Sequence, residues 1–224
     1  MVESVRAHHT GQIVDRTATK GSPTAGGMPL SLLFGLALAF TYVVFGWLAS
    51  LHYPTPYSPF HNNTLSQLGN TQINPRGAPY YLAGCALSGI FAIAFFVSLK
   101  PWHRTGTRAQ NRLLMVVQGL GIVGGVALVM NAVFPENHYG QHHFWAGVLF
   151  NSLGAALFLA SFALRRRERP NLGLSGVTAL ASAAVIVMFV FARTHWVEWV
   201  PVMLFLISPV LLGFHTHRIA SQSM

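Results

Sequence analysis

Long apolar runs fill the chain from residue 29 onward, and short polar segments separate them. Each run has about 17–23 residues, enough for a helix to cross about 30 Å of hydrocarbon at about 1.5 Å per residue. Pro201 and Pro209 lie in the last run and predict a kinked or tilted helix there. The pattern therefore predicts an all-α, polytopic integral membrane protein, a six-helix bundle with transmembrane helices at residues 29–51, 79–99, 113–134, 143–164, 174–192 and 198–214.

Polar segments precede and join these runs. Residues 1–28 are rich in Gly, Thr and Ser and lack apolar periodicity, which is typical of a disordered tail. No polar segment is long enough to fold alone, so residues 29–217 should form one transmembrane domain. Its longest connection is the loop at 52–78, whose prolines lower the entropy lost on ordering. We expect this loop to be ordered and to pack over the turn at 135–145.

Basic residues predict the orientation of the helices. The tail, the loop at 100–112, the run at 165–169 and Arg218 hold twelve of the fourteen Lys and Arg residues, and the alternate loops hold only Arg76 and Arg193. Under the positive-inside rule this places both termini in the cytoplasm and residues 52–78 outside, in a bacterial inner or plasma membrane. The formal net charge of +9 forms no basic stripe, so we expect no nucleic-acid partner.

Polar chemistry is scarce in a chain that is 52% hydrophobic and 8% charged, and it concentrates on the predicted outer face. The segment 135–145 brings three histidines and a carboxylate into a short turn between two apolar runs. Six of the eleven histidines face outward in this topology. A His-rich functional site is therefore expected on this face.

Four short motifs on that face carry a family resemblance: Tyr57-Ser-Pro, Thr64-Leu-Ser-Gln-Leu-Gly69, Phe134-Pro-Glu and His142 at the start of the fourth run. Together they resemble the bacterial domain-of-unknown-function 998 family over about residues 30–215. That family is similar to the six-helix group that contains the autophagy modulator DRAM and the GPI-anchor lipid-remodelling proteins. The resemblance implies a six-helix membrane protein connected with lipid handling. It implies no catalytic assignment, and its motif residues here are Ser66, Gly69, Glu136 and His142.

The leading hypothesis is a protein that binds a lipid or amphiphile in its outward half. His142, Glu136 and Ser66 would form a polar site, which would be catalytic if His142 acts as general base on water or on the Ser66 hydroxyl while Glu136 orients it. The chemistry would then be lipid hydrolysis or acyl transfer, although no nucleophile-elbow motif surrounds Ser66. The ligand-binding candidates are Arg76 and Arg193 for an anionic headgroup, Asn131 for a cavity beneath the site, and His195.

Two alternatives come from other classes of protein. His138 and His142 are four residues apart and, with His195, could hold a divalent metal such as zinc, with Glu136 or Glu198 completing the shell. The other alternative is a non-enzymatic scaffold or regulator whose outer loops bind a protein partner.

The neighbouring His143 is rotated by about 100° around a helix from His142 and should face another way.

Overall fold

The computed structural model describes residues 28–58, 63–104, 107–165, 171–190 and 198–222, and these residues form helices and connections with no strand. The predicted all-α fold is confirmed, and one long helix overlaps each predicted apolar run. The predicted tail lies almost entirely outside the described residues. The long helices are α1 Leu30–Leu51, α2 Ala78–Val97, α3 Arg108–Val133, α4 Tyr139–Arg165, α5 Leu172–Val190 and α6 Trp199–Gln222, and the short 3₁₀ helices are η1 Ser66–Gly69 and η2 Lys100–Arg104.

Five of the long helices, α1, α2, α3, α4 and α6, are long and apolar enough to cross a membrane. The chain is therefore an integral membrane protein. The apolar part of α5, Leu172–Val187, is shorter. A sixth span and the cytoplasmic placement of both termini stay predictions.

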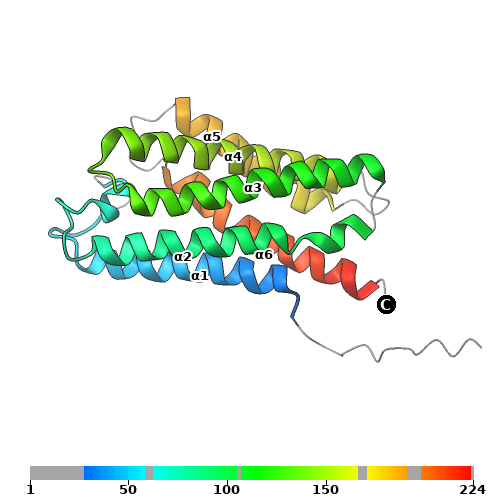
Figure 1. Cartoon of the computed structure of the whole chain (residues 1–224), viewed down its shortest axis with the longest axis horizontal. Coiled ribbons are helices and arrows are strands. Elements are labelled where there is room, and N and C mark those ends of the chain that lie inside the picture. Colours follow the sequence, from blue (N-terminus) through cyan, green and yellow to red (C-terminus); the bar gives the residue numbers. More distant parts are fainter. Residues whose placement is uncertain (1–27, 59–62, 105–106, 166–170, 191–197, 223–224) are drawn as a thin grey trace, which may run out of the picture.

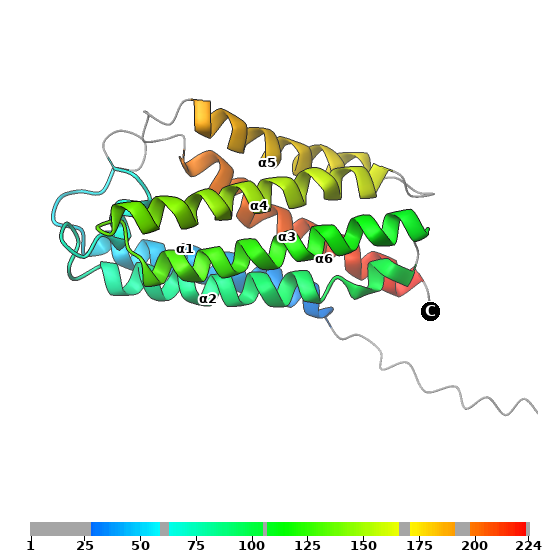
Figure 2. The same ribbon diagram turned by 45° about the horizontal axis from the view of Figure 1, so that its top comes forward.

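The helices form a closed ring. Each helix packs against the next along the chain, and α6 returns to pack against α1. Figures 1 and 2 show them side by side along the long axis of the molecule, with α5 far from α2. The start of α1 and the end of α6 lie at the same end of the bundle as η2, which we call the η2 end; the loop containing η1 and the turn between α3 and α4 lie at the opposite end, the η1 end.

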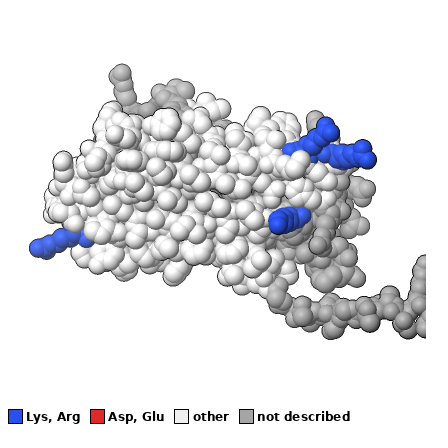
Figure 3. Space-filling view, in the orientation of Figure 1, with Lys and Arg blue, Asp and Glu red and all other residues white. Residues whose placement is uncertain are grey.

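The outer surface of the ring is apolar. Large side chains such as Phe144 on α4 (61% exposed) and Phe40 on α1 (68% exposed) point away from the bundle. Basic side chains gather towards the two ends of the molecule in Figure 3, and the broad face between them shows neither Lys or Arg nor Asp or Glu. This distribution matches a belt of hydrocarbon around the middle of the bundle.

Small residues let the helices approach closely. A Cβ atom on Gly89 of α2 would lie 2.6 Å from the carbonyl oxygen of Gly125 on α3, so neither position has room for a side chain. A Cβ on Gly121 would overlap the Phe96 ring. Between α6 and α1, a Cβ on Gly35 would lie 2.9 Å from the Pro209 carbonyl oxygen. Glycines therefore allow close contacts between α2 and α3 and between α1 and α6.

Hydrogen bonds between side chains reinforce the η2 end. The buried Trp102 of η2 donates its indole N–H to Thr216 Oγ1 on α6, at 2.7 Å. Gln118 on α3 donates to the Phe96 carbonyl at 2.8 Å and also pairs with His103 of η2. The intramembrane Gln118 amide thus joins helices, as amides in membrane interiors commonly do.

One buried amide organises the η1 end. Asn74 is 0% exposed, and its Nδ2 donates to the Ala49 carbonyl of α1 (3.2 Å) and to the Leu68 carbonyl of η1 (3.0 Å). Its Oδ1 accepts from the Gly77 amide at the start of α2, at 3.1 Å. A Cβ on Gly77 would overlap both the Asn74 side chain and the Ala49 carbonyl. A single side chain therefore fixes α1, η1 and α2 relative to one another.

Asn74→Ala should destabilise the protein, because it removes three hydrogen bonds and leaves two buried carbonyls and one buried amide with fewer partners, each at about 1–3 kcal/mol. We expect the melting temperature in mild detergent to fall by about 5 °C or more. Asn151→Ala is the control, because Asn151 is exposed on α4 and donates only to Gly147 one turn earlier. A fall for the Asn74 variant no larger than for the control would contradict this role.

Candidate functional site

A cavity of about 450 Å³ lies inside the ring and extends from the η1 end past the middle of the bundle. Residues of α1, α2, α3, α4 and α6 line it, together with η1 and the turn after α3. Along α4 the lining runs from Tyr139 to Leu157, and the separation of His142 from Leu157 corresponds to roughly 22 Å of helix. Most of the wall is apolar, and the ionisable and amide groups collect at the η1 end. The apolar wall includes Leu38, Leu128, Phe150, Leu153, Val202 and Phe205.

His142 is buried in the first turn of α4 (8% exposed), whereas His143 is exposed. The Nδ1 atom of His142 lies 3.0 Å from the Phe134 carbonyl oxygen, and the Nε2 atom of His142 lies 3.2 Å from Ser66 Oγ. A carbonyl can only accept, so this network assigns the proton to Nδ1 and leaves the Nε2 lone pair to accept from the Ser66 hydroxyl. The structure thus brings His142 and Ser66 together. His142 and His143 differ in burial, as expected, although His143 also lines the cavity.

Glu136 lines the same cavity but does not orient His142. Its carboxylate accepts a hydrogen bond from Asn70 Nδ2 at 2.9 Å, and both ring nitrogens of His142 are already engaged elsewhere. The expected role of Glu136 in orienting the ring is therefore wrong. The reason is local geometry, since α3 ends at Val133 and the next residue presents its carbonyl to the imidazole.

The described part of the 52–78 loop packs on the turn between α3 and α4, as expected. Besides the bond from Asn70 to Glu136, the Thr71 amide and hydroxyl both donate to Asn137 Oδ1, at 3.3 and 3.1 Å. Within the loop, the Tyr57 hydroxyl donates a hydrogen bond to the Thr64 carbonyl oxygen, at 2.9 Å. These contacts hold η1, and with it Ser66, across the end of the cavity.

Glu198, immediately before α6, supplies the second carboxylate. It lines the cavity, and its Oε2 accepts from the Leu65 amide at the start of η1, at 3.2 Å. Burial raises the pKa of the Glu198 carboxyl, while hydrogen bonds from the Leu65 and Ser66 amides act in the opposite direction. The sequence suggested Glu198 only as a further metal ligand. Its contact with η1 joins residues 133 positions apart, and sequence patterns do not reveal a pairing over that distance.

Asn131 on α3 lines the cavity, as the sequence predicted. Its side chain is 7% exposed, and its Oδ1 has no hydrogen-bond partner in the protein. A buried acceptor without a partner is costly and is usually satisfied by a ligand or water. This oxygen therefore marks a position where the cavity requires a donor.

The segment that contains these helices matches the sequence model of a protein family. The family model described as "Protein of unknown function (DUF998)" matches residues 29–215, which contain five of the six long helices whole and most of α6. The chain belongs to the DUF998 family. No curated protein and no solved structure matches it, so the more distant likeness to DRAM and the lipid-remodelling proteins stays a prediction.

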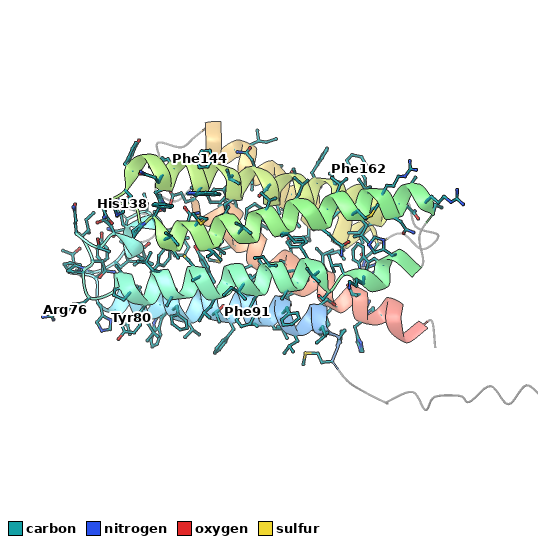
Figure 4. All side chains as sticks on the ribbon, viewed as in Figure 1. Arg76, Tyr80, Phe91, His138, Phe144 and Phe162 are labelled. Atoms are coloured by element: carbon teal, nitrogen blue, oxygen red, sulfur yellow. The ribbon has the colours of Figure 1, made fainter. Side chains whose placement is uncertain are left out.

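Two further predicted site residues of this DUF998 protein, Arg76 and His138, are described and do not line the cavity. Arg76 is exposed at the tip of the η1 end and points away from the bundle in Figure 4, and it does not line the cavity. Arg193 and His195 lie outside the described residues. His138 is exposed and also does not line the cavity.

The two described histidines of the suggested metal site differ in burial. His138 is exposed directly before α4, where its carbonyl accepts from the His142 amide at 2.9 Å, whereas His142 is buried. No group of three or more His, Cys, Asp or Glu residues suited to a metal ion occurs in the part of the chain that the structure describes. The suggested zinc site, which includes His195 outside the described residues, stays a prediction.

His142→Ala should lower the stability of the folded protein by about 1–3 kcal/mol, because the Phe134 carbonyl and the Ser66 hydroxyl both lose a partner. His143→Ala is the matched control, because the ring of His143 is exposed and bonds only to the Tyr139 carbonyl one turn before it. Thermal unfolding of the two purified variants measures the difference. Equal effects of the two substitutions would contradict the hydrogen-bonding role of His142 at the polar end of the cavity.

Proposed function

We propose that this DUF998 protein binds an amphiphile, such as a membrane lipid, in the cavity of the helix ring. The polar head would lie at the η1 end against Ser66, Glu136 and Glu198, and the hydrocarbon chain would lie along the apolar wall. The observation that supports this proposal is the division of one cavity into a polar end and a long apolar part.

The size and position of the cavity favour this occupant. About 450 Å³ falls within the range of small-molecule sites, which are mostly apolar with a few converging polar groups. An elongated and mostly apolar cavity, roughly 22 Å long beside α4 with its polar end included, suits a hydrocarbon chain with a polar head better than a compact polar metabolite. With the orientation predicted from the basic residues, the polar end would face outward from the cell.

The cavity can be filled at one position without disturbing helix contacts. Gly147 of α4 lines it, and a Cβ there would meet no atom within 4 Å. Gly119 of α3 is equally open but is exposed and does not line the cavity. Both changes to Leu also replace a helical glycine with a good helix former, so the two variants are matched.

Gly147→Leu should reduce the amount of lipid that co-purifies with the protein, because its side chain competes with the ligand for space. A steric conflict of about 1–3 kcal/mol weakens binding by a factor of roughly 5 to 150. Native mass spectrometry after extraction in mild detergent measures bound lipid in the wild type, Gly147→Leu and Gly119→Leu. Equal lipid in all three would contradict the proposal and would favour a scaffold whose outer loops bind a protein.

The second candidate function is ester hydrolysis or acyl transfer on the bound amphiphile. It is favoured by the arrangement in which the Ser66 hydroxyl donates to the unprotonated Nε2 of His142 while the Phe134 carbonyl holds Nδ1–H. In this reaction Ser66 Oγ would attack the ester carbonyl carbon as its proton passes to Nε2. The leaving alcohol would take that proton as the C–O bond breaks, and water or a second alcohol would then accept the acyl group from Ser66.

An alkyl fluorophosphonate should label Ser66 in the folded protein, because this probe reacts with serines that a neighbouring base activates. Peptide mass spectrometry identifies the labelled residue. His142→Ala should lower the labelling rate by at least about a hundredfold, the range for loss of a general base. Ser50→Ala, at an exposed serine bonded to Trp47 on α1, should leave it unchanged. A folded protein whose Ser66 stays unlabelled would exclude this chemistry without affecting amphiphile binding.

A further inference from the structure

The few acidic residues of the chain are distributed unevenly. The sequence has five Asp and Glu residues, at positions 3, 15, 136, 168 and 198. Among the residues that the structure describes there are two, Glu136 and Glu198, and both line the cavity. A protein with a formal net charge of +9 therefore directs both of its described carboxylates into one internal space.

No Lys or Arg side chain from the described segments lines the cavity. The described outer-loop cation, Arg76, points away from the bundle (Figure 4). Two carboxylates in a partly buried site of low dielectric repel an anion and attract a cation. The charge of this site therefore opposes an anionic headgroup, which the sequence had suggested through Arg76.

The hydrogen-bonding groups lead to the same conclusion. Glu136 accepts from Asn70, and Glu198 accepts from backbone amides of η1, so each carboxylate keeps acceptor sites of its own. Asn131 Oδ1, in a side chain 7% exposed, has no partner in the protein. The Ser66 hydroxyl already donates to His142. The two carboxylates and Asn131 Oδ1 thus offer acceptors to a ligand, beside the Thr64 hydroxyl, which lines the cavity without a partner and can donate or accept.

We infer that the amphiphile carries a protonated amine, whose N–H groups donate to Glu136, Glu198 and Asn131 Oδ1 at the polar end of the cavity. A quaternary ammonium has the charge but no N–H to donate, and an alcohol has a donor but no charge. A phosphate or carboxylate head has the wrong charge. This inference rests on the proposed amphiphile binding and specifies its headgroup.

Four probes with the same chain and different heads separate these possibilities: hexadecylamine, hexadecyltrimethylammonium, 1-hexadecanol and hexadecyl phosphate. Each is titrated at a low mole fraction into phosphatidylcholine nanodiscs that hold the full-length protein, and displacement of co-purified lipid is followed by native mass spectrometry. Hexadecylamine should bind at least about tenfold more tightly than the other three, the effect of one charge-assisted hydrogen bond.

Variants assign the effect to the cavity. Glu136→Gln and Glu198→Gln should each weaken hexadecylamine binding by about tenfold and leave 1-hexadecanol nearly unchanged. Asn131→Leu should weaken hexadecylamine, whereas Asn151→Leu, at an exposed amide on α4, should not. Arg76→Gln is the charge control at the surface of the same end.

The outcomes separate the headgroup from the binding itself. If 1-hexadecanol and hexadecylamine bind equally, and Gly147→Leu abolishes both, the amine is wrong and amphiphile binding stands. If hexadecyltrimethylammonium equals hexadecylamine, donation by N–H is wrong. Preferential binding of hexadecyl phosphate would overturn the inference and direct attention to Arg193, outside the described residues. Gly147→Leu, whose cavity is filled, is the reference for non-specific binding. If no probe binds the wild type more tightly than it binds Gly147→Leu, both the headgroup and the proposed function are wrong.

Discussion

The buried amide of Asn74 is the constraint on which the η1 end depends. Its hydrogen bonds to the carbonyls of Ala49 and Leu68, and from the Gly77 amide, close the connection between α1 and α2 over the bundle. Because carbonyls at a helix end must find partners when they are buried, this closure is strongly determined. It sets the position of η1, and η1 in turn presents Ser66 to His142 and the Leu65 amide to Glu198.

Hydrophobic patterning predicted the helices well because each apolar run must lie in lipid or in the ring, and both environments favour a continuous helix. The same reasoning placed Asn131 beneath the turn and distinguished the buried His142 from the exposed His143. Predictions about turns were weaker. Whether His138 belonged to α4, and which group would hold the His142 ring, depended on where α3 and α4 end, and periodicity does not determine this to the residue.

Long-range polar pairing could not be predicted from the sequence. Asn74 is one of several asparagines in a polar loop, and nothing in its neighbourhood identifies it as the one that joins α1, η1 and α2. Glu198 meets η1 from the far end of the chain. Arg76 was expected at the site because it is the cation of the outer loop, but its side chain is exposed at the tip. Once these groups are placed, the site changes from one suited to anions to one dominated by two carboxylates.

The contact between Glu198 and the start of η1 also bears on how the molecule is made. Helices enter the membrane in chain order, so α1 to α4 can assemble with the η1 loop before the last helix is synthesised. Leu65 and Glu198 are 133 residues apart, and the ring closes only when α6 packs on α1. Until then the interior is open to the surrounding lipid on the side that α6 will occupy. The last inserted helix therefore completes the cavity wall and delivers one of its two acids in the same step, so an unfinished chain has the fold of its first helices but not the site.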